Sequence, residues 1–235
     1  MTNLLPLSIE EILAHPAFPT VLEFHTPDRQ GSALVAEGRA GGPISIGYEV
    51  HGTGPVHLVW IMGLNAPKIA WYRPWYQHVA RRIEMIRPKN LAARLEAAKA
   101  NLFSEEWLTR PDDLGEFPTN ADRFVAEDLW RIEKLPAPVY QGTLLQGLAV
   151  SWHYMGPERL KVLGAEIPDI LVVTGDNDAL IEHKHSDVLV DGIGGTVRKI
   201  LFPGVGHCLQ FEVVDEYHTM LEEFILHAQK KYWKS

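Results

Sequence analysis

The sequence predicts an α/β protein in which a mostly parallel sheet is interrupted by a helical insertion. Two runs, VHLVWIMG at 56–63 and DILVVTG at 169–175, are apolar at nearly every position, as strands are when helices cover both faces of a parallel sheet. Between these runs, residues 75–161 show leucine and alanine at helical spacing. We therefore expect one domain over residues 1–235, with a helical lid at about 75–165 inserted between sheet segments 20–71 and 166–235.

Composition narrows the class of protein. Apolar residues make up 46% and charged residues 22% of the chain, the balance of a folded protein rather than a disordered one. The net charge of -8 gives nucleic-acid binding no electrostatic support. The single cysteine, Cys208, excludes an internal disulfide and fits a reducing compartment. Without a signal-peptide pattern or an apolar run of about 18 residues, we expect a cytoplasmic protein with no membrane or nucleic-acid partner.

The first elements are a short helix and several strands. Ser8 and Glu11 have the spacing of a capping box, which predicts a helix from there to about His15, before Pro16. Strand-like pieces follow between glycines and prolines. They are VLEFH, ALVAEG and ISIGYEV, within residues 20–50.

Helical patterns fill the middle and the end of the chain. Four segments of the middle have helical spacing, proline starts or capping residues: PKNLAARLEAAKANLF, TNADRFVAEDLWRIEK, YQGTLLQGLAVSWHYM and PERLKVLG. A last helix is predicted at 213–234, where apolar residues form one stripe and lysines lie near the C-terminal end.

One βαβ unit is predicted in the last third. The run at 169–175 is followed by a polar loop and a helix-length segment at 176–195, and then by VRKILFPG at 197–204. A connection of that length suits a right-handed crossover between two parallel strands.

Three strand ends together carry a resemblance. One apolar run ends in Met62-Gly63-Leu64-Asn65, the next in Gly175-Asp176-Asn177-Asp178, and the last is followed by Gly206-His207. In this order, over roughly residues 20–231, they resemble the α/β-hydrolase family. The resemblance implies a truncated α/β-hydrolase fold with Asp178 as the catalytic acid and His207 as the base. It implies that backbone amides near Gly63 and Leu64 form half of an oxyanion hole, and that the substrate is a small apolar ester, amide, lactone or epoxide. No cofactor or metal is expected.

The chemistry itself requires such a pair. A hydroxyl group is a poor nucleophile at its own pKa, so an imidazole must accept its proton. A carboxylate must hold that imidazole in the correct tautomer.

The sequence departs from the family at the nucleophile. The family places it in a G-x-S-x-G turn, which none of the seven serines has: Ser8, Ser32, Ser45, Ser104, Ser151, Ser186 and Ser235. From Gly63 the chain reaches WYRPWY at 71–76 and then the helical region, so on the order of 60 to 90 residues of the family's pattern are missing. A skipped exon, a faulty gene model or an engineered deletion would each produce the junction at Trp71–Trp75. The nucleophile is therefore unknown, and we expect impaired activity; the alternative is a non-catalytic truncated isoform or a small-molecule-binding protein.

Several residues have a second interpretation. Asp176 and Asp178 could cap the following helix. Cys208 could replace the missing nucleophile, although a lone cysteine is usually a small buried hydrophobe. His183 and His185 suggest a metal pair, but no third ligand is near in sequence, which favours a solvated helix face. Four aromatic residues could line a pocket in the lid or simply pack its helices: Trp107, Trp130, Trp152 and Tyr154.

Overall fold

The computed structural model describes residues 6–22, 26–35, 37–38, 43–53, 90–134, 155–195 and 197–232. The chain divides into two compact units. The described parts of Met1–Val21 and Gly63–Ser235 form one unit, and those of Leu22–Met62 form the other. The strand predicted at 56–63 and residues 140–154 of a predicted helix lie outside the described residues.

The smaller unit contains a β-hairpin. Strand β1 (Arg29–Val35) pairs antiparallel with β2 (Ile44–Val50), with Arg29 opposite Val50 and Val35 opposite Ile44. The residues that connect them are fewer than the dozen or so that a parallel crossover needs, so the chain can only turn back on itself. The sequence placed the first of these strands at 33–38, whereas the pairing with β2 starts it at Arg29.

The predicted mostly parallel sheet is wrong. The described residues form two separate sheets of two strands each, and the hairpin is antiparallel. Helices make up most of the remaining described structure. The truncated α/β-hydrolase fold therefore does not describe this molecule. Apolar runs and turn residues are local signals, and they do not determine which strands join into one sheet.

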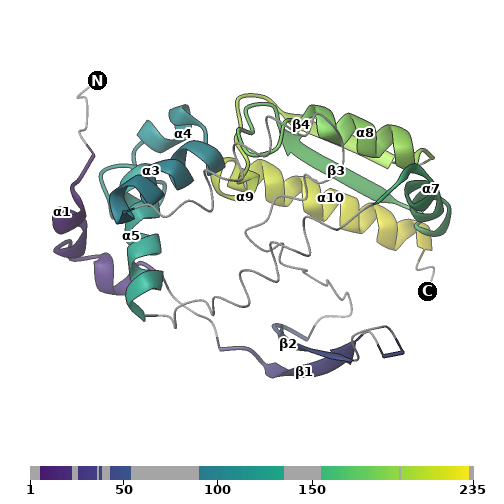
Figure 1. Cartoon of the computed structure of the whole chain (residues 1–235), viewed down its shortest axis with the longest axis horizontal. Coiled ribbons are helices and arrows are strands. Elements are labelled where there is room, and N and C mark those ends of the chain that lie inside the picture. The colour runs from purple at the N-terminus through teal and green to yellow at the C-terminus, as the bar shows by residue number, and fades with distance from the viewer. Residues whose placement is uncertain are drawn as a thin grey trace. The chain divides into compact units, whose positions relative to one another are not determined.

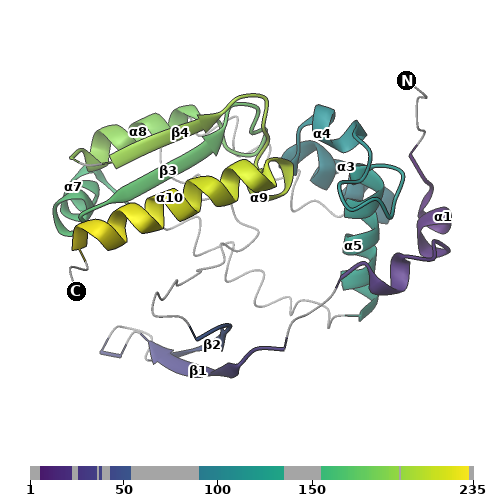
Figure 2. The ribbon, with the colours of Figure 1, turned by 180° about the vertical axis from the view of Figure 1, so that it is seen from behind.

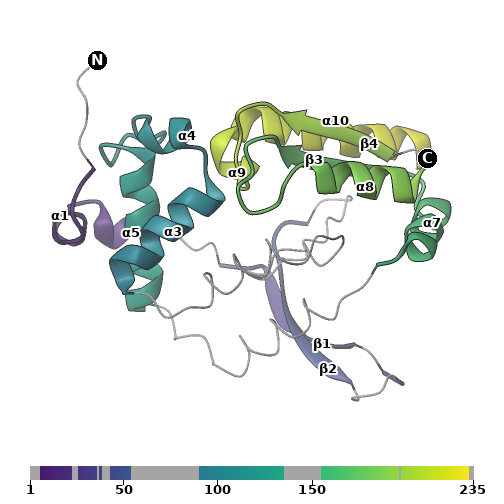
Figure 3. The ribbon, with the colours of Figure 1, turned by 45° about the horizontal axis from the view of Figure 1, so that its top comes forward.

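Helices from the first half of the chain pack around α5 (Asn120–Lys134), as Figure 3 shows. They are listed here with a 3₁₀ turn: α1 (Ile9–Leu13), η1 (Phe18–Thr20), α3 (Leu91–Leu102) and α4 (Glu105–Thr109). The predicted capping box is confirmed, because Ser8 Oγ accepts from the Glu11 amide and Glu11 accepts from the Ser8 amide. Each element contributes apolar side chains to a shared core, among them Ile12, Leu95, Trp107 and Leu129. Burial of side chains of this size stabilises by about 1.5–3 kcal/mol each.

The last third forms the predicted βαβ unit. Strand β3 (Ile170–Gly175) pairs in parallel with β4 (Val197–Phe202), and α8 (Lys184–Ile193) connects them. The parallel pair is thereby confirmed. Figures 1 and 2 show the two strands between α8 on one face and α10 (Val214–Tyr232) on the other. Two further helices complete this part, α7 (Pro157–Glu166) against α8 and the short α9 (Leu209–Glu212) before α10.

None of the helices in the described ranges is both long enough and apolar enough to cross a membrane.

Candidate functional site

Asp178 and His207 meet at the carboxyl end of the β3–β4 pair. Asp178 follows β3 after a short turn, and His207 lies in the loop after β4. Loops that leave the carboxyl ends of two neighbouring parallel strands emerge at the same edge of the sheet. The strand pairing therefore brings together two residues that are 29 positions apart in the sequence.

A hydrogen bond joins the two side chains. Nδ1 of His207 lies 2.8 Å from Oδ2 of Asp178. The second carboxylate oxygen, Oδ1, accepts from the backbone amides of Leu180 at 2.8 Å and Ile181 at 2.7 Å. Because Oδ1 is occupied by its own turn, Oδ2 is left directed at the imidazole.

The two partners differ in exposure. The Asp178 side chain is 6% exposed and that of His207 is 31% exposed. A buried carboxylate requires hydrogen-bond donors, and Asp178 has them. With its proton on Nδ1, the imidazole donates to Asp178 and keeps a lone pair on Nε2. In the part of the chain that the structure describes, no residue bonds to Nε2, so this nitrogen can accept a proton from a bound molecule.

Backbone contacts hold the turn after β3 against the loop after β4. The Asn177 amide donates to the carbonyl of Val205 at 3.1 Å, and the Gly204 amide donates to Oδ1 of Asp176 at 2.6 Å. A Cβ atom at Gly175 would lie 2.1 Å from the Val205 carbonyl oxygen, so only glycine permits this approach. The position of His207 relative to Asp178 is therefore set by the main chain as well as by the side chains.

Neither aspartate caps α8. Asp176 accepts from the opposite loop and Asp178 from its own turn, while His183 at the start of α8 makes no side-chain capping bond. The capping interpretation of these aspartates is wrong.

The main chain on both sides of His207 is bonded to groups outside its loop. The amide of Gly206 donates to Oε1 of Glu212 at 3.0 Å. The amide of Cys208 donates to the carbonyl of Leu102, at the end of α3, at 2.9 Å. The histidine thus lies between the β3 turn and the helical part of the same unit.

The Ser104 side chain lies near this loop, but its hydroxyl group already makes two hydrogen bonds. It is the N-cap of α4, and its hydroxyl accepts from the Trp107 amide at 3.2 Å. The same hydroxyl donates to Oε2 of Glu212 at 2.5 Å. Because the Ser104 hydroxyl donates its proton in a hydrogen bond to Glu212, it is not arranged to be activated by His207.

Cys208 is also poorly suited to nucleophilic attack. Burial of the thiol, together with the carboxylates of Glu212 and Asp178, raises its pKa to about 11. A reactive cysteine needs a lowered pKa, because the thiolate is the nucleophile. The substitute-nucleophile interpretation is therefore disfavoured.

Gly63 and Leu64, predicted to supply the oxyanion-hole amides, lie outside the described residues, as do Ser151 and the junction at 71–75. No group of three or more possible metal ligands occurs within the described ranges, including around His183 and His185.

The aromatic residues of the predicted lid serve helix packing where they are described. The Trp107 ring stacks on Phe103 at 4.6 Å, and its indole donates to Asp113 at 3.2 Å. The indole of Trp130 donates to the carbonyl of Pro19 at 3.2 Å. Trp152 and Tyr154 lie outside the described residues.

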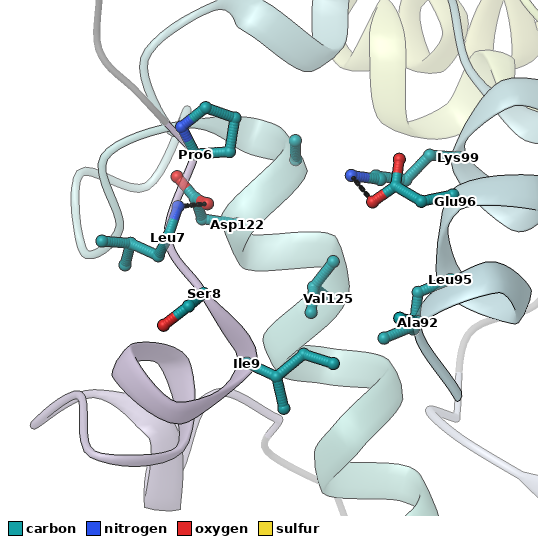
Figure 4. Close-up of a pocket in the computed structure, with 11 residues that line it drawn as sticks. Pro6, Leu7, Ser8, Ile9, Ala92, Leu95, Glu96, Lys99, Asp122 and Val125 are labelled. Atoms are coloured by element: carbon teal, nitrogen blue, oxygen red, sulfur yellow. Dashed lines mark hydrogen bonds and ion pairs between the residues drawn. The ribbon is translucent and has the colours of Figure 1, made fainter. Parts of the chain in front are cut away.

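A hollow of about 200 Å³ lies between the N-terminal segment, α3 and α5 (Figure 4). It is smaller than the roughly 300–1,000 Å³ of typical small-molecule sites. Its charged groups have protein partners already, since Lys99 pairs with Glu96 at 2.7 Å and Asp122 accepts from the Leu7 amide at 2.8 Å. The Asp178–His207 pair is therefore the better candidate for chemistry.

No protein-family model matches this sequence. A comparison with curated proteins also finds no significant match. The resemblance to α/β-hydrolases accordingly rests on the residues quoted for it, of which Asp178 and His207 are placed together by the structure.

Glu212 was missed by the sequence reasoning. It is a carboxylate that is only 8% exposed, and it binds the residue next to His207. A signal for it exists, because Glu212 is the only charged residue in the run Leu209–Val214. Because acidic residues are rarely buried, the sequence pattern by itself indicates an exposed Glu212, and only the structure shows that it is buried.

Proposed function

We propose that this protein hydrolyses a small apolar ester, amide, lactone or epoxide, with His207 as the proton-transfer group and Asp178 as its orienting carboxylate. The observation that supports the proposal is the 2.8 Å contact between Nδ1 of His207 and Oδ2 of Asp178. It leaves Nε2 as the basic nitrogen of a partly exposed ring.

For an ester, the proposed reaction moves one proton in two steps. Nε2 takes a proton from the attacking oxygen of water or of a hydroxyl group while that oxygen forms a bond to the carbonyl carbon. The carboxylate of Asp178 stabilises the imidazolium that results. The bond to the alkoxide then breaks, and Nε2 returns the proton to the leaving oxygen. Where the attacking oxygen is a hydroxyl group of the protein, the acyl group stays on it. A water molecule that gives its proton to Nε2 then attacks the acyl carbon, the bond to the protein oxygen breaks, that oxygen regains the proton, and the acid is released.

A second candidate is a non-catalytic protein that binds a small apolar molecule. The observation in its favour is that, among the described residues, no hydroxyl or thiol bonds to Nε2 of His207. In that case the acid–histidine pair would be a remnant of an ancestral hydrolase. We place either form in the cytoplasm, which the single cysteine supports.

Turnover of p-nitrophenyl acetate and butyrate by the full chain tests the proposal. Replacement of His207 by Ala is expected to lower kcat by roughly 10²- to 10⁴-fold, the usual contribution of a general base, and added imidazole should restore part of it. His218→Ala is the matched control, because His218 is exposed on α10. Equal turnover by the two histidine variants would reject the hydrolase proposal.

Two further measurements separate the candidates. Fluorophosphonate labelling of a serine that is abolished in His207→Ala would support the hydrolase and identify its nucleophile. The transcript sequence between the codons for Trp71 and Trp75 tests the remnant, because a longer form would contain the missing turn.

A further inference from the structure

The geometry points to Glu212 as a positioning residue for His207, one that joins the start of α4 to the proton-transfer pair. This role rests on the function proposed for His207. It adds a residue to which neither the resemblance nor the sequence pattern gave a role.

Glu212 collects three hydrogen bonds from two segments. Its Oε1 accepts from the amides of Ser104 at 2.9 Å and Gly206 at 3.0 Å. Its Oε2 accepts from the Ser104 hydroxyl at 2.5 Å. Ser104 is 108 positions away in the sequence, so one buried carboxylate connects distant parts of the chain.

The contact of Glu212 with Ser104 and Gly206, called the joint from here on, is tightly packed. A Cβ atom at Gly206 would lie 2.6 Å from Oε1 of Glu212 and 2.9 Å from the backbone of Phe103 and Ser104. The rings of Phe103 and Phe211 meet edge to face with centroids 6.1 Å apart. The residue before His207 therefore has no room to move independently of the start of α4.

His207 depends on this joint because the peptide directly before it is held by a residue outside its own loop. On the β3 side, Asn177 and Asp176 bind Val205 and Gly204. Directly before the histidine, the Gly206 amide is held by Glu212. Weakening of that bond loosens the peptide on one side of His207, while the Cys208 amide on the other side stays bound to the Leu102 carbonyl. Small misplacements of a catalytic group can lower reaction rates.

The carboxylate is suited to this task by its charge. Three donors converge on two oxygens, and bonds to an ionised acceptor are about twice as strong as neutral ones. Glutamine in the same place would present an amino group to the Ser104 hydroxyl and keep one accepting oxygen. Glu212→Gln is therefore a variant of the same shape that weakens the joint without leaving a cavity.

Nuclear magnetic resonance of the ¹⁵N-labelled full chain tests the role directly. In Glu212→Gln and Ser104→Ala, the proton on Nδ1 of His207 is expected to exchange with water about tenfold faster, the effect of losing one hydrogen bond. The amide of Leu180, which binds the far oxygen of Asp178, should keep its exchange rate. Glu216→Gln is the matched control, because Glu216 is exposed on α10.

If the protein turns over an ester, the steady-state kinetics of that reaction give a second test. Glu212→Gln should lower kcat by about tenfold with KM unchanged, since the altered group does not touch substrate. If Glu212→Gln does not fold, Ser104→Ala still tests the claim, because it removes one of the three bonds to Glu212 and keeps those from the two backbone amides.

The outcomes are distinct from those for the hydrolase. Unchanged His207 exchange in Glu212→Gln and Ser104→Ala, matching Glu216→Gln, would overturn the positioning role and leave the hydrolase proposal intact. An equal rise at Leu180 would also overturn it, because the effect would then be a general loss of stability. Faster exchange at His207 in a chain that turns over no small apolar ester, amide, lactone or epoxide would support the positioning role and reject the hydrolase.

Discussion

The α-carbon of Gly175 faces the carbonyl oxygen of Val205 so closely that a Cβ atom at position 175 would lie 2.1 Å from that oxygen. This approach joins the end of β3 to the loop that carries His207. The atoms that a Cβ at position 175 would meet belong to the main chain of Val205 and Gly206. A change of side-chain rotamer therefore cannot relieve the contact.

Gly175→Ala should therefore separate the two loops. We expect the variant to lose about 1–3 kcal/mol of unfolding free energy, the usual cost of overpacking, and to lose the His207–Asp178 contact. Urea denaturation and the His207 Nδ1 proton signal measure the two effects. Gly47→Ala is the control, because no atom lies within 4 Å of the added Cβ there; equal stability of the two variants would contradict the close contact.

Asp178→Asn should change the tautomer of His207 and leave the turn intact. Asparagine keeps an oxygen for the amides of Leu180 and Ile181, but its amino group then faces Nδ1. The imidazole must place its proton on Nε2 and can no longer act as a base, so turnover should fall by up to about 10⁴-fold. The ¹⁵N shifts of the ring report the tautomer, with the exposed Asp215→Asn as control. A Nδ1-protonated ring in the variant would show that Asp178 does not orient His207.

Arg123→Met should strongly destabilise the helical part. Nε of Arg123 lies 2.6 Å from Oδ1 of Asp112, and the Asp112 side chain is 0% exposed. Removal of one partner of a buried ion pair costs about 3–5 kcal/mol, because the other charge is left without its counterion. Arg110→Met is the control, since Arg110 is 49% exposed and pairs with the exposed Glu106. Equal urea midpoints for the two variants would contradict the importance of the buried pair.

The Asp112 carboxylate should make the unfolding free energy depend on pH. Burial opposes ionisation of Asp112, but hydrogen bonds from the Phe117 amide, from Arg123 and from further backbone amides outweigh it, and the pKa of Asp112 is lowered. A lowered folded-state pKa adds stability above the unfolded pKa of about 3.9, and this stability is lost as pH falls through the folded pKa.

The unfolding free energies of the unmodified protein and Asp112→Asn should therefore converge as the pH falls from 6 to 3. Other carboxylates with lowered pKa values, such as those of Glu11 and Asp187, are present in both proteins and cancel in the difference. A difference that stays constant over this range would show that Asp112 is not the group responsible.

Cys208 should react slowly at neutral pH. Burial first, and the carboxylates of Glu212 and Asp178 next, raise the pKa of its thiol to about 11. The thiolate is therefore a minor form until the pH approaches that value, and iodoacetamide should modify Cys208 at least about tenfold more slowly than glutathione at pH 7.5. Cys208→Ser should retain any esterase activity. Rapid labelling at pH 7.5 would restore Cys208 as a nucleophile candidate.

Local patterns predicted the βαβ unit correctly. The apolar run before Gly175 and the one before Phe202 became β3 and β4, with α8 between them. The capping box at Ser8 and the long last helix are confirmed for the same reason. Each depends on residues within one or two turns, where periodicity and capping act directly.

The predicted parallel sheet failed because strand pairing is not a local property. The hairpin strands looked like members of the same sheet as β3, but they pair with each other in antiparallel orientation. Connection length, rather than apolar pattern, decided their direction.

From the sequence alone came the helix and strand periods and the parallel pair, because those depend on neighbouring residues. The choice of Asp178 and His207 as candidates came from the resemblance of three strand ends to the α/β-hydrolase family. The tertiary structure alone decided that their side chains meet at 2.8 Å. It also decided that Glu212 is buried against Ser104, and that the Ser104 and Cys208 side chains are unsuited to attack. Burial and hydrogen bonding across more than a hundred residues arise only when the chain is packed, and they control which of several polar side chains is free to react.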